Sequence, residues 1–179
     1  EPSLTSGQIM VRSLIFSCAP TIRNWLNAPG RSYRASTEIG QPIMGMGAAE
    51  VIKSRHPEFQ VGDRLTAVLP WQDYAVLTPA KAAVPIVKIP CEADIVDAMS
   101  IHSLNSLTAY FGLTRIAEVR EGQTVLVSGA AGSVGAMACQ IARLLGCRVV
   151  GIAGGPRKCA WLVETCGVAA AIDYHEGQI

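Results

Sequence analysis

The feature that most constrains this chain is a turn of small residues at 128–135, placed between two apolar segments. Residues 125–127 form a short apolar run typical of a buried strand, and residues 134–145 carry apolar side chains at helical spacing. Glycines in such a turn let the backbone approach phosphate groups, and the following helix N-terminus presents free N–H groups to them. The sequence therefore predicts a strand, turn and helix that bind a dinucleotide pyrophosphate.

The residues after this helix indicate which dinucleotide is preferred. We expect Gly146 to end the helix and residues 148–153 to form a second, parallel strand. A site for NAD normally has a carboxylate about 20 residues beyond the glycines, but residues 153–155 contain none, and Arg157 and Lys158 follow. Lys158 could simply be a solvated lysine, yet a cation is disfavoured at the positive end of a helix. The pattern favours a ribose 2′-phosphate and predicts NADP(H), with the role of Arg157 left open.

Composition and charge set broad limits on the class of protein. The 179 residues are 50% hydrophobic and 16% charged, with a formal net charge of +1, which is an ordinary globular balance. This balance offers no basic surface for nucleic acid or an anionic membrane. No apolar run approaches the roughly 18–20 residues of a membrane span, and residues 1–4 do not resemble a signal peptide. We expect a cytoplasmic protein.

The cysteines show neither a metal-binding nor a disulfide pattern. There is no CxxC pair among them, and several fall at the apolar positions of the predicted helices. Buried free thiols that act as small hydrophobic side chains are the better interpretation. The six are Cys18, Cys91, Cys139, Cys147, Cys159 and Cys166.

The two halves of the chain have different periodicities. Residues 1–90 read mostly as short strands interrupted by glycine and proline, whereas helical spacing begins after Cys91. Two strand–helix units follow, and residues 169–174 read as a third strand. We expect an α/β protein with a mostly β domain at 1–90 and the first half of a Rossmann domain at 91–179.

These segments together resemble the zinc-free medium-chain dehydrogenase/reductases, in the branch of NADPH-dependent alkenal/one reductases that includes the leukotriene B4 dehydrogenases (prostaglandin reductases) and curcumin reductase. The resemblance covers nearly the whole chain and is most specific at 124–174. It also includes the segments 20–23, 31–33, 54–57, 61–63, 71–76 and 107–113.

The resemblance implies a GroES-like N-terminal domain, a Rossmann cofactor domain and a homodimer. It implies that NADPH delivers hydride to the β-carbon of an α,β-unsaturated aldehyde or ketone, so the enzyme must stabilise an enolate and supply a proton. Tyr33 is the candidate catalytic hydroxyl near the substrate carbonyl, with a packed loop tyrosine as the alternative. The residues that match the family's cofactor contacts are Gly132, Ser133, Val134 and Gly135 for the pyrophosphate, Lys158 and Tyr174 for the 2′-phosphate, and Thr108 and Asn105 near the nicotinamide.

Two further expectations concern metal and length. Zinc-dependent relatives carry a His-Glu pair in the segment that matches 43–53, where this chain has Met44-Gly45-Met46-Gly47, so we predict no metal site. Family members are considerably longer than 179 residues, and ending after the third strand would leave the strand at 124–128 at a sheet edge. We expect the sequence to be part of a longer polypeptide.

Two other functions remain open at this point. A zinc-free quinone reductase would share the glycine turn and the two-domain plan, although segments 31–33 and 71–74 favour the alkenal/one branch. A non-catalytic nucleotide-binding or structural relative would bind NADPH without oxidising it with any enone. The expected partner is a small enal or enone, with neither nucleic acid nor membrane.

Overall fold

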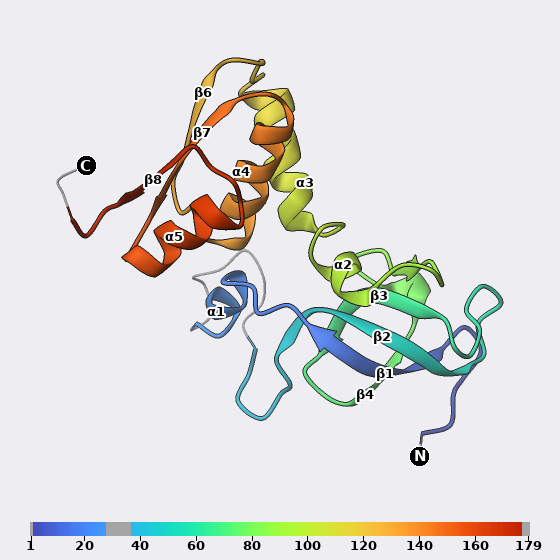
Figure 1. Cartoon of the computed structure of the whole chain (residues 1–179). Helices are drawn as coiled ribbons and strands as arrows, with labels where there is room; N and C mark the ends of the chain where they lie inside the picture. The colour runs from blue at the N-terminus through green and yellow to red at the C-terminus, as the bar shows by residue number, and fades with distance from the viewer. Residues whose placement is uncertain (1, 28–36, 177–179) are drawn as a thin grey trace. The chain divides into compact units, whose positions relative to one another are not determined.

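The computed structural model describes residues 2–27 and 37–176, and the chain forms two compact units, Glu1–Met99 and Ser100–Ile179 (Figure 1). The first unit contains an antiparallel sheet and the second a parallel sheet with helices. The predicted fold class, a mostly β N-terminal part followed by the start of a Rossmann-type α/β part, is confirmed. The functional domain boundary near Cys91 stays a prediction.

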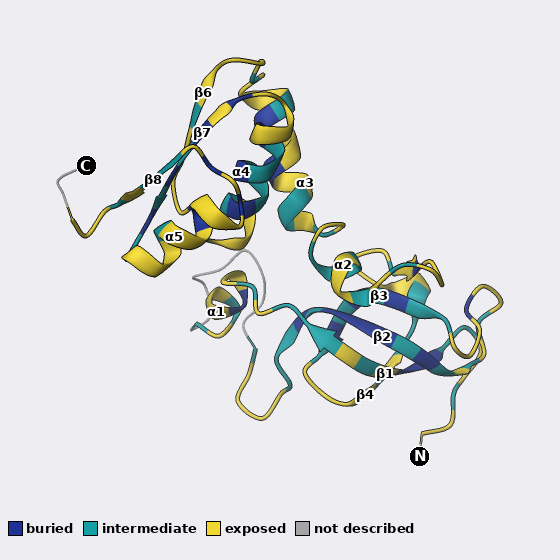
Figure 2. Ribbon diagram, in the orientation of Figure 1, coloured by how far each residue is buried: buried dark blue, intermediate teal, exposed yellow. Residues whose placement is uncertain are grey.

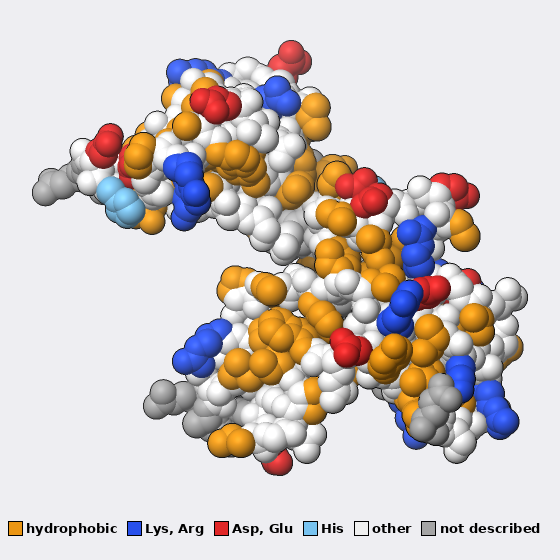
Figure 3. All heavy atoms as spheres, turned by 60° about the horizontal axis from the view of Figure 1, so that its bottom comes forward, with side chains coloured by type: hydrophobic (Ala, Val, Ile, Leu, Met, Phe, Trp, Pro, Cys, Tyr) orange, Lys and Arg blue, Asp and Glu red, His pale blue; other side chains and the backbone are white. Residues whose placement is uncertain are grey.

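The buried residues of each unit lie mainly in its sheet and, in the second unit, also in α4. The surface carries charges of both signs. Buried positions lie mainly on β1–β3 in the first unit and on α4 and β7 in the second (Figure 2). On the face drawn in Figure 3, Lys and Arg side chains alternate with acidic and apolar ones and form no broad basic area. In the part of the chain that the structure describes, no helix has the length and apolar character to cross a membrane.

The first unit is built on a five-stranded antiparallel sheet in the order β4-β1-β2-β3-β5. The register pairs Val11 with Val51 and Ala49 with Leu65, and β1 is irregular between Ser13 and Ile15. The strands are β1 (Ile9–Phe16), β2 (Met44–Ser54), β3 (Arg64–Pro70), β4 (Tyr74–Leu77) and β5 (Val87–Ile89). The short helices of this unit are α1 (Thr21–Trp25), η1 (Pro79–Lys81) and α2 (Ile95–Met99).

Alternation of side chains along these strands creates the core of the first unit. Along β3 every second residue is buried, because successive side chains of a strand point to opposite faces. The buried side chains of β1, β2 and β3 meet on one face and pack with Phe59. This cluster consists of Ile9, Val11, Ala49, Val51, Phe59, Leu65, Ala67 and Leu69.

The second unit contains a three-stranded parallel sheet in the order β6-β7-β8. Its strands are β6 (Thr124–Val127), β7 (Arg148–Ala153) and β8 (Ala170–Asp173). Its helices are α3 (Leu104–Phe111), which continues into the π-helical turn η2 (Gly112–Ile116), then α4 (Ser133–Leu144) and α5 (Pro156–Glu164). Gly146 has φ +78° directly after α4, which confirms the predicted left-handed end of that helix.

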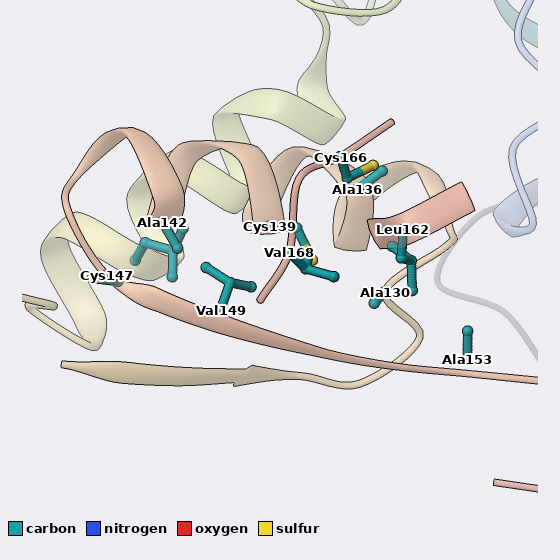
Figure 4. Close-up of a cluster of buried hydrophobic side chains, with 11 residues drawn as sticks. Ala130, Ala136, Cys139, Ala142, Cys147, Val149, Ala153, Leu162, Cys166 and Val168 are labelled. Carbon is teal, nitrogen blue, oxygen red and sulfur yellow. The ribbon is translucent and has the colours of Figure 1, made fainter. Parts of the chain in front are cut away.

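Helices α4 and α5 cover one face of this sheet through small and medium side chains. Figure 4 shows Ala136, Cys139 and Ala142 of α4 on the same side as Val149 of β7, with Ala130 beside Leu162 of α5. Cys139 and Leu162 are completely buried. The small side chains allow the helices to approach the sheet closely. The contact between Ala130 and Leu162 anchors the turn before α4 against α5.

The opposite face of the parallel sheet is apolar but open. Leu126 is 61% exposed and Ile172 is 38% exposed, although both lie in strands. Parallel sheets in α/β proteins are normally covered on both faces. The register also places Val150 and Ala170 on this face beside Leu126, and β6 is an edge strand.

Candidate dinucleotide-binding site

The turn between β6 and α4 owes its shape to the backbone. Gly129 adopts φ +59°, a conformation that favours glycine. The N–H of Gly132 donates to the carbonyl of Gly129 at 2.9 Å, which closes the turn. The N–H of Ala130 donates to the carbonyl of Ile152 in β7, also at 2.9 Å. The turn is thus fixed both to itself and to the neighbouring strand.

Gly135 allows α4 to lie against this turn. A Cβ at this position would overlap the carbonyl oxygen of Gly129 and lie 2.8 Å from the Cα of Ala130. Both contacts are to backbone, which cannot move aside without breaking the turn. Glycine at 135 is therefore required by the packing of the helix on its own preceding turn.

The N-terminus of α4 is open to a ligand. Gly132 is the N-cap, and no side-chain hydrogen bond caps the helix there. Gly132, Ser133 and Val134 are exposed. The first N–H groups of a helix have no intrahelical acceptor and carry the positive end of the dipole. The predicted pyrophosphate residues are therefore together at one accessible helix start.

Helix α3 brings one predicted nicotinamide-side residue to the same helix start. The amide Nδ2 of Asn105 donates to the hydroxyl Oγ of Ser133 at 3.2 Å. Thr108 lies one turn further along α3 and is exposed, and its hydroxyl donates to the carbonyl of Leu104 at 2.7 Å. Ser103 begins α3 by accepting the N–H of Asn105 at 3.3 Å. Asn105 and Thr108 therefore share one face of α3.

The loop between β7 and α5 forms the second part of the candidate site. Gly155 is the N-cap of α5 with φ +89°, and Pro156 occupies the first turn. A Cβ at Gly154 would lie 2.5 Å from the hydroxyl oxygen of Tyr174, so the tyrosine side chain lies directly on this glycine. The N–H of Tyr174 donates to the carbonyl of Ala153 at 3.2 Å. The loop and the end of β8 are thus held together.

Lys158 is exposed in the first turn of α5, as the sequence predicted. No acidic residue lies in that turn, and no ion pair of Lys158 occurs within the described residues. A cation at the positive end of a helix is unfavourable without an anionic partner. The Lys158 ammonium is therefore available to an anion. Lys158 and Tyr174 both flank the Gly154–Gly155 loop.

Asp173 was missed as a site residue by sequence reasoning, which treated it only as part of a strand. Its Oδ1 accepts the N–H of Gly155 at 2.9 Å and the N–H of His175 at 3.0 Å. These two N–H groups lower the pKa of the carboxyl below its ordinary value. The only signal in the sequence was a carboxylate at the end of a strand, directly before Tyr174.

The cysteines and the Met-Gly-Met-Gly segment have structural explanations. All six cysteines are free, and Cys139, Cys147 and Cys166 are buried. Burial, with a contribution from Cys166, raises the pKa of Cys139 to about 11, which disfavours the nucleophilic thiolate form. A Cβ at Gly45 would lie 2.8 Å from the indole Nε1 of Trp71, so glycine lets the tryptophan approach β2. Within residues 2–27 and 37–176, no group of three or more His, Cys, Asp or Glu could hold a metal ion.

Tyr33, the predicted catalytic hydroxyl, lies outside the described residues. The structure therefore places the predicted cofactor residues but gives no position for the predicted substrate residue.

Comparison with known proteins covers almost the whole chain. Residues 1–86 match the model of the N-terminal domain of oxidoreductase. The NADP(+)-dependent 2-alkenal reductase of Nicotiana tabacum is 34% identical over 97% of this chain and 50% of its own length. NADPH-dependent curcumin reductase of Escherichia coli is 34% identical over 94% of this chain and 48% of its own. Prostaglandin reductase 1 of Bos taurus is also 34% identical, over 97% and 50%.

Solved structures agree with these relatives. The crystal structure of CurA from Vibrio vulnificus has a TM-score of 0.85 and 33% identity, and covers 99% of this chain and 51% of its own. CurA has also been solved in complex with NADPH, again with a TM-score of 0.85. The chain spans about half the length of the curated relatives it matches. From its sequence and its fold, this chain belongs to the medium-chain dehydrogenase/reductase family of oxidoreductases, in the branch of the alkenal, prostaglandin and curcumin reductases.

Proposed function

We propose that this chain provides the NADPH-binding part of a reductase that acts on the carbon–carbon double bond of α,β-unsaturated aldehydes and ketones. The observation that carries the proposal is the pairing of two glycine loops in one unit. The first leads into the open N-terminus of α4. The second has no carboxylate at residues 153–155, where a site for NAD normally carries one, and it is followed by Lys158 in the first turn of α5 and contacted by Tyr174. The names of the relatives support both the cofactor and the substrate class.

The residues present fit the cofactor at each of its charged parts. The N–H groups of residues 133–135 would hold the pyrophosphate, because that helix start is accessible and Gly135 brings α4 close to the turn. Gly132 would take part as the exposed N-cap, since its own N–H closes the turn. Lys158 and the hydroxyl of Tyr174 would hold the 2′-phosphate, and Arg157 is exposed beside them. When bound, NADPH supplies the hydride for the β-carbon of the substrate.

Asn105 and Thr108 would act on the nicotinamide side. The Asn105–Ser133 hydrogen bond ties α3 to the start of α4, so the two elements define one edge of the cofactor site. Thr108 donates its hydroxyl proton to its own helix, which leaves the oxygen lone pairs as acceptors facing solvent. These residues would orient the cofactor and do not themselves transfer protons.

The substrate side of the proposal depends on Tyr33. Transfer of hydride to the β-carbon places negative charge on the carbonyl oxygen, and a hydroxyl donor there would stabilise the enolate. The assignment to Tyr33 remains a prediction from the sequence resemblance. A Tyr33→Phe variant should lower kcat for an enone with little change in the Kd for NADPH, and an unchanged kcat would remove Tyr33 from the chemistry.

The family resemblance predicts a homodimer. Quinone reduction is the second candidate activity, since it requires the same cofactor site. A relative that binds the cofactor without catalysis is the third.

One set of measurements separates these functions. Purified protein is incubated with NADPH and either an enal, an enone or a quinone, and absorbance of the reduced cofactor is followed. We expect consumption with the enal and enone, and much slower consumption with the quinone. Faster turnover of the quinone would favour the sibling activity. Binding of NADPH without turnover of any of the three would favour the non-catalytic alternative.

A further inference from the structure

Asp173 is a partly buried residue whose carboxylate has an unusual set of contacts for the end of a strand, with Nδ1 of His175 3.8 Å from its Oδ1. Its side chain is only 8% exposed. Oδ1 accepts two backbone N–H groups, and Oδ2 is buried with no hydrogen-bond partner among the described residues. A buried carboxylate is costly unless it is well paired, so its presence here calls for an explanation.

Asp173 accepts hydrogen bonds from two N–H groups that are close in sequence to the predicted 2′-phosphate ligands: Gly155 precedes Lys158, and His175 follows Tyr174. Gly155 begins α5, so its position and its φ of +89° set where the first turn and Lys158 point. His175 directly follows Tyr174, so its N–H fixes the backbone just after the tyrosine. One carboxylate oxygen therefore fixes the backbone that carries both Lys158 and Tyr174.

A purely local role does not account for this arrangement. The bond from His175 back to Asp173 spans two residues and is a common turn within a loop. The bond from Gly155 spans 18 residues and connects the loop after β7 to the end of β8. This bond joins the segment that carries Lys158 to the segment that carries Tyr174. Selectivity for a phosphorylated ribose would require these two segments to keep a fixed relative position.

We infer that Asp173 is a positioning residue for selectivity toward a 2′-phosphate, acting through Gly155 and His175. The inference rests on the proposed NADPH site. Asp173 does not bind the phosphate itself, because two anions would repel each other. Its acceptor oxygen holds the loop, so that the Lys158 ammonium and the Tyr174 hydroxyl are preorganised before the ligand arrives.

The test uses this chain with two half-cofactors, 2′,5′-ADP and 5′-AMP, which differ only in the 2′-phosphate. Isothermal titration calorimetry gives the Kd for each, and the ratio of the two measures selectivity without any need for the nicotinamide or for turnover. Wild type should prefer 2′,5′-ADP by about tenfold or more, the amount expected for hydrogen bonds to a charged group.

Four variants assign the cause. Asp173→Asn keeps an oxygen acceptor without the charge, and should keep at least the wild-type preference. Asp173→Ala removes the acceptor, and should reduce the preference about fivefold while the Kd for 5′-AMP changes less than twofold. Asp173→Glu misplaces the acceptor by one methylene and should behave like alanine, which keeps the test valid if the alanine variant fails to fold. Asp63→Ala is the matched control, since Asp63 also accepts a backbone N–H, from Gln60 at 2.7 Å, in the first unit.

The outcomes separate the two proposals. If wild type binds both half-cofactors equally, the proposed NADPH preference fails and the inference fails with it. If wild type prefers 2′,5′-ADP and a folded Asp173→Ala or Asp173→Glu keeps the same ratio, only the positioning role is overturned. The same conclusion holds if Asp63→Ala lowers the ratio as much as Asp173→Ala, or if Asp173→Asn lowers it as much as alanine does.

Discussion

The turn after β6 and the loop after β7 both lead from a parallel strand into a helix, but different interactions maintain their shapes. The first turn is held by backbone hydrogen bonds and by the lack of a side chain at Gly135. The second loop is held by a side chain, the Asp173 carboxylate, which accepts the N–H of Gly155. Close approach of backbone determines the first. The second depends on the side chains of Asp173 and Tyr174, together with one backbone hydrogen bond from Tyr174 to Ala153.

This difference matches the parts of the ligand that each would bind. A pyrophosphate is common to NAD and NADP, so its site needs a fixed backbone and few specific side chains. The 2′-phosphate is the only group that distinguishes the two cofactors, so its site needs a cation and a loop that can be adjusted by side chains. Substitutions in the first turn should therefore affect all dinucleotides, and substitutions around the second should affect selectivity.

Gly135→Ala should have the largest effect. The new Cβ would overlap the Gly129 carbonyl oxygen, and backbone cannot rotate away as a side chain can. We expect a loss of about 1–3 kcal/mol in the free energy of unfolding, measured by urea denaturation, and loss of binding for NADPH and NADH alike.

The matched control for that variant is Gly112→Ala. Gly112 has helical dihedral angles, and a Cβ there would meet no atom within 4 Å. Stability should stay the same or rise slightly, because alanine favours helices over glycine. Equal tolerance of alanine at 135 and 112 would contradict the close approach of α4 to its turn.

Lys158→Ala should have the next largest effect, and only on the phosphorylated cofactor. A charge-assisted hydrogen bond contributes about 1.5–3 kcal/mol, or roughly 10–150-fold in Kd. We expect the Kd for NADPH to rise within this range, while the Kd for NADH changes little. Arg157→Ala, one position earlier and also exposed, is the neighbouring control and decides whether that residue contributes. An equal loss for both cofactors would exclude a 2′-phosphate role for Lys158.

Much of the parallel unit could be predicted because its signals are local in the sequence. The glycine spacing before α4, the left-handed Gly146 and the lysine in the first turn of α5 each depend on neighbours within a few residues. The bond between Asp173 and Gly155 could not be predicted, because it joins residues 18 apart through a loop geometry that no local pattern encodes. The approach of Trp71 to Gly45 in the first unit could not be predicted for the same reason, because these two residues are also far apart in the sequence.

Gly154→Ala should have a smaller effect than the loss of Lys158. Its Cβ would lie 2.5 Å from the Tyr174 hydroxyl and 2.6 Å from the ring carbon Cζ. Tyr174 is half exposed and can move aside, so the fold should survive while the hydroxyl leaves its position. We expect a rise of about 2–10-fold in the Kd for 2′,5′-ADP, the range of one neutral hydrogen bond, and none for 5′-AMP. Tyr174→Phe removes the hydroxyl without displacing the ring, and a rise in the Kd for 2′,5′-ADP at least as large as that of Gly154→Ala would support a role for the hydroxyl. If neither variant changes this Kd, Tyr174 is not part of the 2′-phosphate site.

The smallest effect should appear in the acid stability of the second loop. The N–H groups of Gly155 and His175 lower the pKa of Asp173 in the folded chain below the ordinary value of about 3.9. A lowered folded-state pKa means that the ionised carboxylate stabilises the fold above pH 4, and that this contribution is lost as the pH falls through the folded-state pKa. Asp173→Asn has no proton to gain, so the Tm of wild type should fall relative to the Tm of this variant between pH 5 and pH 3.

The pKa of Asp63 is lowered too, by the Gln60 N–H and Lys88, so Asp63→Asn should show the same trend in the first unit. A Tm difference at Asp173 that is constant across this range would mean that its carboxylate is not held by the loop in solution.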